Sequence, residues 1–212
     1  MFTGIIEEIG TVQAVRKNAA SLALTVQAHK VLADMQEGDS IAVNGICLTV
    51  TSFSAESFTA DVMHETLLYT TFARLHSGSP VNLERAMQAN GRFGGHIVAG
   101  HIDGTGTILA VQKDDNAVWY TIRAGKDIMH YIVKKGSVAV DGISLTVAET
   151  ADNRFQVSII PYTAACTTLG LCRVGDTVNL ETDCMGKYIE KLLQTPAPQN
   201  GVTQAYLEKF GF

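Results

Sequence analysis

The stretch Asn44-Gly45-Ile46-Cys47-Leu48-Thr49-Val50 decides the fold, because a close copy, Asp141-Gly142-Ile143-Ser144-Leu145-Thr146-Val147, follows 97 residues later. Asn-Gly or Asp-Gly ahead of an apolar, β-branched run is typical of a tight turn that enters a strand, since glycine tolerates positive φ and Val, Ile and Thr fit a pleated surface. Side chains alternate between the faces of a strand, so Cys47 and Thr49 share one face, as do their counterparts in the second copy. Each copy therefore presents a short row of small polar groups.

The repeat extends far beyond this turn. At the same offset, residues 40–86 align with residues 137–183 without a gap. Both segments close on the same pattern, Val81-Asn82-Leu83-Glu84 in the first and Val178-Asn179-Leu180-Glu181 in the second. Two units of this length indicate tandem domains rather than a solenoid, which would need shorter and more numerous repeats.

Upstream of this block the offset is 96 and pairs Gly4 with Gly100 and Ile6 with Ile102. We place the boundary between the units near Gly94-Gly95. A chain of 212 residues with 46% hydrophobic content has room for two cores. The predicted domains are a first barrel at residues 1–95, a second at 96–184, and a C-terminal helix and tail at 185–212.

The charge pattern excludes several classes of partner. Charged residues make up 17% of the chain, the net charge is −5, and Lys and Arg form no cluster. This argues against binding to nucleic acid or to an anionic membrane and favours neutral or weakly charged ligands. The N-terminal residues lack a basic flank, and no uncharged stretch reaches membrane-spanning length. We expect a soluble, cytoplasmic protein.

The cysteines give little support for a metal site or a disulfide framework. Cys47, Cys166, Cys172 and Cys184 form no Cys-x-x-Cys pair, and no histidine lies at the spacing of a zinc ligand. We expect four reduced thiols and no bound metal.

Most of the chain has the pattern of short strands. Residues 11–15 and 22–26 alternate apolar with polar positions around a hairpin turn at Lys17-Asn18, and similar runs recur in both units. One helical turn at residues 29–35 and a short helix at residues 66–75 interrupt the strands of the first unit. Many short strands at this spacing indicate an all-β sandwich or small barrel rather than a parallel α/β sheet.

An amphipathic helix is expected after the second unit. Met185, Ile189, Leu192 and Leu193 recur at helical spacing behind Asp183, which can cap the helix, and Pro196 and Pro198 end it. The apolar stripe fits either a lid on the second barrel or a contact between subunits. The tail at 195–212 is either a loose end or a second helix that packs on a neighbour.

Seven motifs in order along the chain resemble those of the riboflavin synthases of the alpha-chain type. They are Met1-Phe2-Thr3-Gly4-Ile5-Ile6, residues 44–50, Arg92-Phe93-Gly94-Gly95-His96, Gly100-His101-Ile102-Asp103-Gly104, residues 141–147, Ile160-Pro161-Tyr162-Thr163 and Gly186-Lys187-Tyr188-Ile189-Glu190-Lys191-Leu192. The resemblance runs from Met1 to about Leu193. It implies two similar six-stranded Greek-key barrels in tandem and a C-terminal helix that holds a homotrimer.

The resemblance also implies a reaction, the last step of riboflavin biosynthesis. Two molecules of 6,7-dimethyl-8-ribityllumazine dismutate when one gives a four-carbon unit to the other, which yields riboflavin and 5-amino-6-ribitylamino-uracil. No cofactor is needed, since the lumazine ring is its own electron sink. Duplication suits this chemistry, because two similar barrels can each hold one substrate, and orientation of two reactants can supply roughly 7 to 11 kcal/mol of the barrier.

By the same resemblance, the active site lies between the first barrel of one subunit and the second barrel of its neighbour. The first barrel's wall would comprise Gly4, Ile5, Ile6, Cys47, Leu48, Thr49, Asp61, Val62, Met63, His64, Glu65 and Thr66. The second barrel's wall would comprise Gly100, His101, Ile102, Lys135, Ser144, Leu145, Thr146, Ile159, Ile160, Pro161, Tyr162, Thr163 and Ala164.

The two copies differ where the substrates would take different roles. One lumazine must lose a proton from its 7-methyl group, and His101 is our first candidate for that transfer because imidazole titrates near neutral pH. Ser144 and Thr146 would position or hydrogen-bond a ring or an adding nucleophile, and Cys47 could do so from the other barrel. Asp183, near the start of the C-terminal helix, would support the second site.

Each candidate also has a purely structural interpretation. Ser144 can be an ordinary polar residue of a strand face, and Cys47 a small buried apolar residue with no adjacent base. His101 can simply satisfy a backbone carbonyl, while His96 and His64 are weaker candidates for catalysis. One departure from the family pattern is Ala99, where many relatives carry serine, so a catalytic hydroxyl at that position is not supported.

A rival function on the same frame is a non-catalytic lumazine- or flavin-binding protein that serves as an optical antenna. Such relatives keep one good ligand site and let the other degrade. Here both turns are intact, as are Phe2-Thr3-Gly4 and His101, which favours the enzyme. A tandem-barrel interaction module without a small-molecule site would leave both polar rows unexplained.

Overall fold

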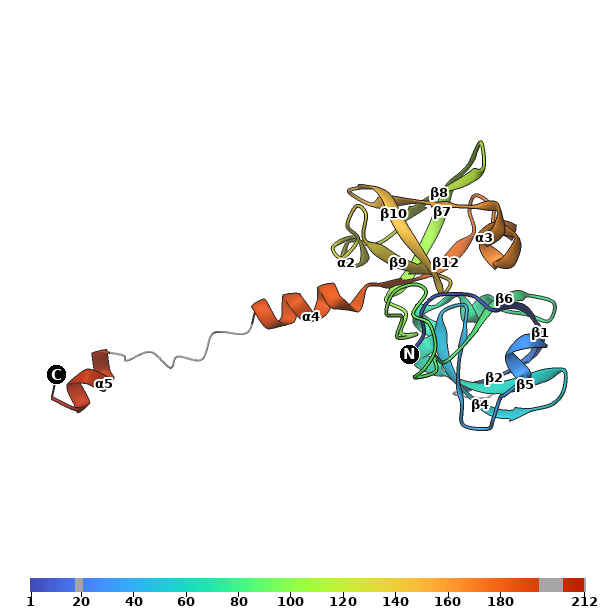
Figure 1. Ribbon diagram of the computed structural model, residues 1–212, viewed down its shortest axis with the longest axis horizontal. Helices are drawn as coiled ribbons and strands as arrows, with labels where there is room; N and C mark the ends of the chain where they lie inside the picture. Colours follow the sequence, from blue (N-terminus) through green and yellow to red (C-terminus); the bar gives the residue numbers. More distant parts are fainter. Residues whose placement is uncertain (18–20, 195–203, 212) are drawn as a thin grey trace.

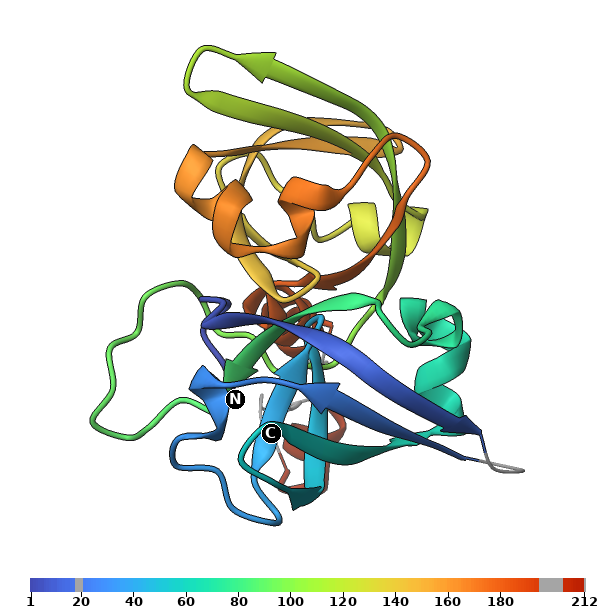
Figure 2. The ribbon, with the colours of Figure 1, turned by 90° about the vertical axis from the view of Figure 1, so that its right-hand side faces the viewer.

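The chain folds into two closed six-stranded antiparallel barrels, one above the other in Figure 1 and in the turned view of Figure 2. The computed structural model describes residues 1–17, 21–194 and 204–211. The first barrel consists of β1 Glu8–Lys17, β2 Ser21–Gln27, β3 Ser40–Val43, β4 Ile46–Phe53, β5 Ser57–Met63 and β6 Pro80–Arg85. The second consists of β7 Gly104–Asp114, β8 Ala117–Arg123, β9 Ser137–Val140, β10 Ile143–Ala151, β11 Arg154–Ile159 and β12 Thr177–Thr182.

Both barrels have the same strand order. Neighbouring strands run β1-β2-β5-β4-β3-β6 in the first barrel and β7-β8-β11-β10-β9-β12 in the second, all of them antiparallel. The connection from β2 to β3 passes over β5 and β4, which makes each barrel a Greek key. The expectation of two similar six-stranded Greek-key barrels is confirmed.

The interior of each barrel is filled with apolar side chains. In the first barrel Leu24, Val50 and Phe58 are essentially without solvent exposure, and Ile122 and Phe155 are equally buried in the second. Closing a small sheet leaves an interior just wide enough for such side chains. A ligand must therefore bind on the outside of a barrel.

Short helical segments connect some of the strands, and two further helices, α4 and α5, follow the last strand. They are η1 Lys30–Leu32, α1 His64–Tyr69, η2 Thr71–Arg74, α2 Lys126–Met129, α3 Pro161–Cys166, η3 Thr168–Leu171, α4 Cys184–Leu193 and α5 Gln204–Lys209. The single helix expected at residues 66–75 is wrong in its bounds, because it starts at His64 and breaks at Thr70. Thr70 is extended, and its hydroxyl accepts from the backbone N–H of Phe72, so it ends α1 and caps η2.

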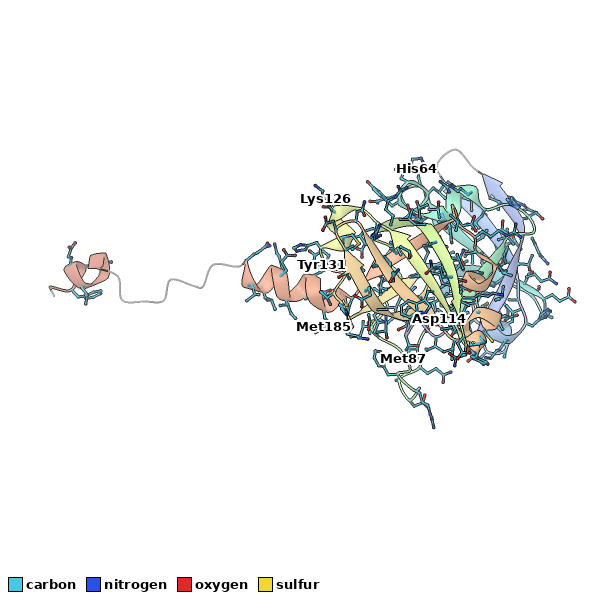
Figure 3. All side chains as sticks on the ribbon, turned by 90° about the horizontal axis from the view of Figure 1, so that it is seen from above. His64, Met87, Asp114, Lys126, Tyr131 and Met185 are labelled. Carbon is cyan, nitrogen blue, oxygen red and sulfur yellow. The ribbon has the colours of Figure 1, made fainter. Side chains whose placement is uncertain are left out.

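Helix α4 extends away from both barrels (Figures 1 and 3). It begins as expected, since the Asp183 side chain accepts from the backbone N–H of Met185. No residue of α4 is buried, and Leu192 and Leu193 are 72% and 81% exposed. The helix is therefore not a lid on the second barrel, although His130 and Tyr131 of that barrel donate hydrogen bonds to Glu190 in the second half of α4.

The tail beyond α4 is only partly described. Pro196 and Pro198 and the aromatic Phe212 lie outside the described residues, whereas the second helix considered for the tail is present as α5. Within the described parts of the chain, no helix combines the length and apolar character needed to cross a membrane.

The two barrels meet at the duplicated turns. A Cβ added to Gly45 would lie 2.6 Å from the backbone nitrogen of Gly142, and one added to Gly142 would lie 2.7 Å from that of Gly45. Both glycines have φ near +80°. Contacts across this point are reciprocal: Asn82 Nδ2 donates to Asp141 O, and Asn179 Nδ2 donates to Asn44 O, each over 3.0 Å. An approximate two-fold axis therefore passes between the two turns.

Replacing Gly45 by alanine should lower the free energy of unfolding by more than the strain of a left-handed backbone conformation alone. The new methyl group would both adopt a positive φ, at about 1 to 2 kcal/mol, and press on the opposite backbone, at about 1 to 3 kcal/mol more. Gly38 is the matched control, since its φ is +92° and nothing lies within 4 Å of the added Cβ. Urea unfolding measures both variants, and equal losses for Gly45→Ala and Gly38→Ala would contradict the close packing of the turns.

Candidate functional site

The polar row of each copy faces outward from its barrel. Along β4, Leu48 and Val50 are buried, whereas Cys47 is half-buried and Thr49 is exposed. The same alternation holds along β10, where Ser144 is half-buried and Thr146 is exposed. The two rows begin at the Gly45–Gly142 contact and run away from it along β4 and β10.

Each row is flanked by the segment that precedes the first strand of the other unit. The backbone N–H of Cys47 donates to Gly100 O over 2.9 Å, and that of Ser144 donates to Gly4 O over 2.8 Å. Ile102 packs against the core of the first barrel, and Ile6 against the core of the second. We call residues 2–6 and 98–102 the lead segments.

This exchange corrects the expected walls of the site. Gly4 and Ile6 contact the second barrel, and Gly100 and Ile102 contact the first. Ile5 instead lines a cavity with Glu84 and Arg85 of the first barrel. The repeat had aligned each lead segment with its own unit. An alignment of the two copies shows which residues are equivalent. It does not show whether a lead segment packs on the barrel of its own unit or on that of the other unit, because the spacing along the chain is the same in both cases.

The glycines of the lead segments are required by this close approach. A Cβ on Gly4 would lie 2.6 Å from Ser144 Cβ, and one on Gly100 would lie 2.5 Å from Cys47 Cβ. Both glycines also have positive φ. The matched Gly4 and Gly100 were thus the signal in the sequence for a backbone that packs against another backbone.

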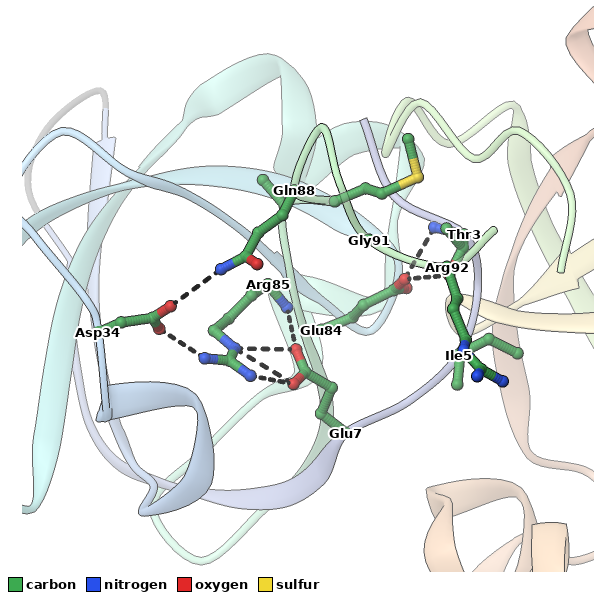
Figure 4. A pocket seen from close by; sticks show the side chains of 11 residues that line it. Thr3, Ile5, Glu7, Asp34, Glu84, Arg85, Gln88, Gly91 and Arg92 are labelled. Carbon is green, nitrogen blue, oxygen red and sulfur yellow. Dashed lines mark hydrogen bonds and ion pairs between the residues drawn. The ribbon is translucent and has the colours of Figure 1, made fainter. Parts of the chain in front are cut away.

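Two buried carboxylates hold the lead segments in place. Glu84 accepts from the backbone N–H groups of Thr3 and Gly4 and from the Thr3 hydroxyl, as Figure 4 shows for Thr3. Glu181 accepts from the backbone N–H groups of Ala99 and Gly100 over 2.7 and 3.0 Å. Burial raises the pKa of both carboxyl groups, that of Glu181 to about 7, while the hydrogen bonds act in the opposite direction.

Apart from Lys135, the remaining candidate residues lie at the ends of β5 and β11 and in the short helices that follow, which we call the rim helices. On the first barrel, Asp61 and Met63 are exposed at the end of β5, Val62 is buried, and His64 to Thr66 open α1. The corresponding residues of the second barrel follow the same course: Ile159 is buried at the end of β11, Ile160 is exposed, and Pro161, Tyr162, Thr163 and Ala164 lie in α3. Lys135 is exposed at a left-handed turn ahead of β9, and its backbone N–H donates to Val147 O.

His101 and Ser144, expected in one wall, lie with different barrels. His101 follows Gly100 and is exposed beside the row that begins at Cys47. Within residues 1–17, 21–194 and 204–211 its ring has no hydrogen-bond partner, so it does not serve to satisfy a backbone carbonyl.

His96 is the histidine that contacts Ser144. Its Nδ1 lies 2.7 Å from Ser144 Oγ, and the residue is buried. Burial lowers the pKa of His96, although the charge of Asp183 acts in the opposite direction. Its Nε2 is buried without a partner in the described structure. Sequence reasoning ranked His96 as a weak candidate; the Gly94-Gly95 pair before it, which lets the chain pass close to Thr3 and Ser144, was the available signal.

A cavity at the end of the first barrel is a separate feature (Figure 4). Arg85 lies in it, and its guanidinium is bound on one side by Glu7, with Nη2 to Oε2 at 2.6 Å, and on the other by Asp34. The guanidinium is thus occupied by two carboxylates. Across the described residues, this cavity included, no group of three or more His, Cys, Asp or Glu side chains is arranged to hold a metal ion.

Comparison with known proteins follows the two units. A family model described as the lumazine binding domain matches residues 3–86 and again residues 99–183. Over 215 residues the chain is 55% identical to a riboflavin synthase of Actinobacillus pleuropneumoniae and 46% identical to one of Bacillus subtilis strain 168, with each chain covered in full.

Solved structures give a similar result. LumP complexed with 6,7-dimethyl-8-(1'-D-ribityl) lumazine superimposes with a TM-score of 0.78 at 26% identity, and LumP complexed with riboflavin with a TM-score of 0.80. In both cases 86% of this chain and 99% of the other are covered.

Introducing a hydroxyl at Ala99 should stabilise the protein above neutral pH. Because the pKa of Glu181 is raised to about 7 in the folded state, its contribution to stability is complete at low pH and is lost as the pH rises through 7. A serine at 99 would supply the donor that Thr3 gives Glu84, favour the carboxylate and reduce that loss. We expect Ala99→Ser to gain about 1 kcal/mol at pH 8 and little at pH 5 in urea unfolding.

Thr3→Ala is the matched control, because it removes the equivalent hydroxyl from Glu84 and should cost more stability at pH 8 than at pH 5. A gain for Ala99→Ser that does not depend on pH would show that the hydroxyl acts elsewhere.

Proposed function

The chain belongs to the riboflavin synthase family of lumazine-binding proteins and is a transferase, and we propose that it dismutates 6,7-dimethyl-8-ribityllumazine. Two molecules react, a four-carbon unit passes from one to the other, and riboflavin and 5-amino-6-ribitylamino-uracil leave. The atoms of the two substrates equal those of the two products, so the reaction as written requires no added cofactor or oxidant.

The observation that carries this proposal is the presence of two complete, equivalent frames. Each barrel has an outward polar row, a lead segment held by a buried glutamate, and a rim helix. Equivalent frames are suited to two identical substrates. The differences between the frames, such as Cys47 against Ser144 and His101 against Ile5, would give the two bound molecules different roles.

We propose the following roles for the candidate residues. His101, exposed beside the first barrel's row, takes the proton from the 7-methyl group of one lumazine. Ser144, with Thr146 two residues along the same strand face, holds the second ring or the nucleophile that adds to it. The His96 ring fixes the direction of the Ser144 hydroxyl. Cys47, the counterpart of Ser144, would contact the ligand on the first barrel.

The two rows support an active site shared between subunits. They diverge from the contact between Gly45 and Gly142, so ligands on the two barrels of one chain would not lie face to face. A first barrel from one copy set against a second barrel from another would bring them together. The exposed apolar residues of α4 provide a surface on which copies can associate, and we propose a homotrimer.

A non-catalytic lumazine binder is the second candidate, because LumP complexes with this lumazine and with riboflavin have the same fold. Two observations favour the enzyme: both frames are complete here, and identity is 55% to a riboflavin synthase against 26% to LumP. We also propose a cytoplasmic location, where the four free thiols would stay reduced.

Purified protein mixed with 6,7-dimethyl-8-ribityllumazine alone should form riboflavin and the pyrimidine product in equal amounts over many turnovers. Riboflavin absorbance and chromatography of the pyrimidine measure this. Binding with altered fluorescence and no product would establish the non-catalytic binder instead.

In the same assay His101→Gln should lower kcat by about 10²-fold or more with little change in ligand affinity, as expected for loss of a general base. His29→Gln is the control, since His29 is exposed and lies outside both expected walls, so it should retain kcat.

Sedimentation equilibrium should give three times the mass of the chain. Replacing Leu192 and Leu193 by glutamate should shift the distribution towards the monomer and lower activity in parallel, because the shared site would come apart. Full activity in a monomeric variant would place the complete site within one chain.

A further inference from the structure

The rim helices α1 and α3 are anchored to their own barrels by partly buried side chains only, Leu67 on the first barrel and Ala164 on the second. They carry candidate site residues, His64 to Thr66 on the first barrel and Pro161 to Ala164 on the second, yet neither helix has a buried residue. The segments that follow them supply a deeper anchor. Those segments are η2 and η3, which bury Phe72 and Leu169 respectively.

Each of these 3-10 helices is bound by an asparagine of the opposite barrel. The backbone N–H of Thr71, at the start of η2, donates to Asn179 Oδ1 of β12 over 2.8 Å. The backbone N–H of Thr168, at the start of η3, donates to Asn82 Oδ1 of β6 over the same distance. These N–H groups belong to the first turn of a helix and would otherwise lack an intrahelical partner.

The two asparagines are themselves rigidly held. Both have 0% exposure. The backbone N–H of Asn179 donates to Asp141 Oδ1. Its Nδ2 donates to Asn44 O, in the turn that leads to Cys47. Asn82 makes the symmetric contacts: its backbone N–H donates to Asn44 Oδ1, and its Nδ2 donates to Asp141 O. One amide group thus joins the turn of a single candidate site to the 3-10 helix that follows its rim helix, and it comes from the other barrel.

We propose that Asn179 and Asn82 are positioning residues for ligand binding, each setting the distance between the polar row and the rim helix of the site on the opposite barrel. This inference rests on the proposed function for its consequence in catalysis. The geometry makes a selective prediction: Asn179 governs the site on the first barrel, and Asn82 the site on the second. A role only in holding the barrels together would affect both sites alike.

Hydrogen exchange read by mass spectrometry on the full chain tests the selectivity. In Asn179→Ala, amides of residues 64–74 should exchange about tenfold faster or more, as expected when a buried hydrogen bond is lost, while residues 161–171 keep their protection. Asn82→Ala should give the reverse pattern, so each variant is the other's control. Equal loss of protection at both segments, or no change at either, would overturn the proposal.

Riboflavin binding gives the second measurement. Fluorescence titration should show one of the two sites per chain weakened by about tenfold in each variant, and added riboflavin should then protect only the unaffected rim segment. If either alanine variant fails to fold, Thr71→Pro and Thr168→Pro remove the same N–H groups at a helix position where proline is tolerated, and residues 64–69 and 161–166 are read instead. Wild-type protein that makes no riboflavin would refute the proposed function, whereas the exchange pattern would still decide the role of the asparagines.

Discussion

The approach of Gly45 to Gly142 is the constraint on which the rest of the molecule depends. Two backbones meet there with no room for a side chain on either, so the turns of both units must carry glycine at the same place. This contact brings Asn44 and Asp141 within reach of the opposite barrel's asparagine, and through it the turn of one barrel is joined to the sheet of the other. The two cores are separate, but the surface between them is one hydrogen-bonded structure.

Both candidate sites are composite as a result. The row on β4 belongs to the first unit, the lead segment beside it to the second, and the asparagine that joins its turn to the 3-10 helix after its rim helix again to the second. The buried carboxylates Glu84 and Glu181 complete this arrangement, since each binds the lead segment of its own unit at the point where that segment crosses to the other barrel. Buried carboxylates that accept backbone N–H groups are costly to leave unpaired, which makes the crossing points firmly defined.

Sequence reasoning predicted the strands and their duplication well because these signals are local, whereas the six-stranded Greek-key barrels were implied by the family resemblance. The Asn-Gly and Asp-Gly turns, the alternating strands and the Asp183 cap each act over a few residues, and their duplication reinforced them. The exchange of lead segments could not be predicted in this way, because it depends on how two equivalent units are placed in space. For the same reason His101 was expected beside Ser144, whereas His96, whose ring contacts Ser144, was ranked low. The single helix expected at residues 66–75 is broken into α1 and η2 at Thr70, whose hydroxyl caps η2. The sequence pattern did not indicate this break.

The crossed lead segments also determine what a single unit could do by itself. Alone, it would expose a strand edge at Cys47 or Ser144 and would leave its lead segment without a barrel on which to pack. Two separate copies of one unit would satisfy each other by the same reciprocal exchange, in the manner of a domain-swapped dimer. The present chain is thus equivalent to such a dimer whose halves are joined by the connection from residue 86 to residue 98. Once joined, the halves were free to diverge, and Cys47 could differ from Ser144 without any change in the frame that holds them.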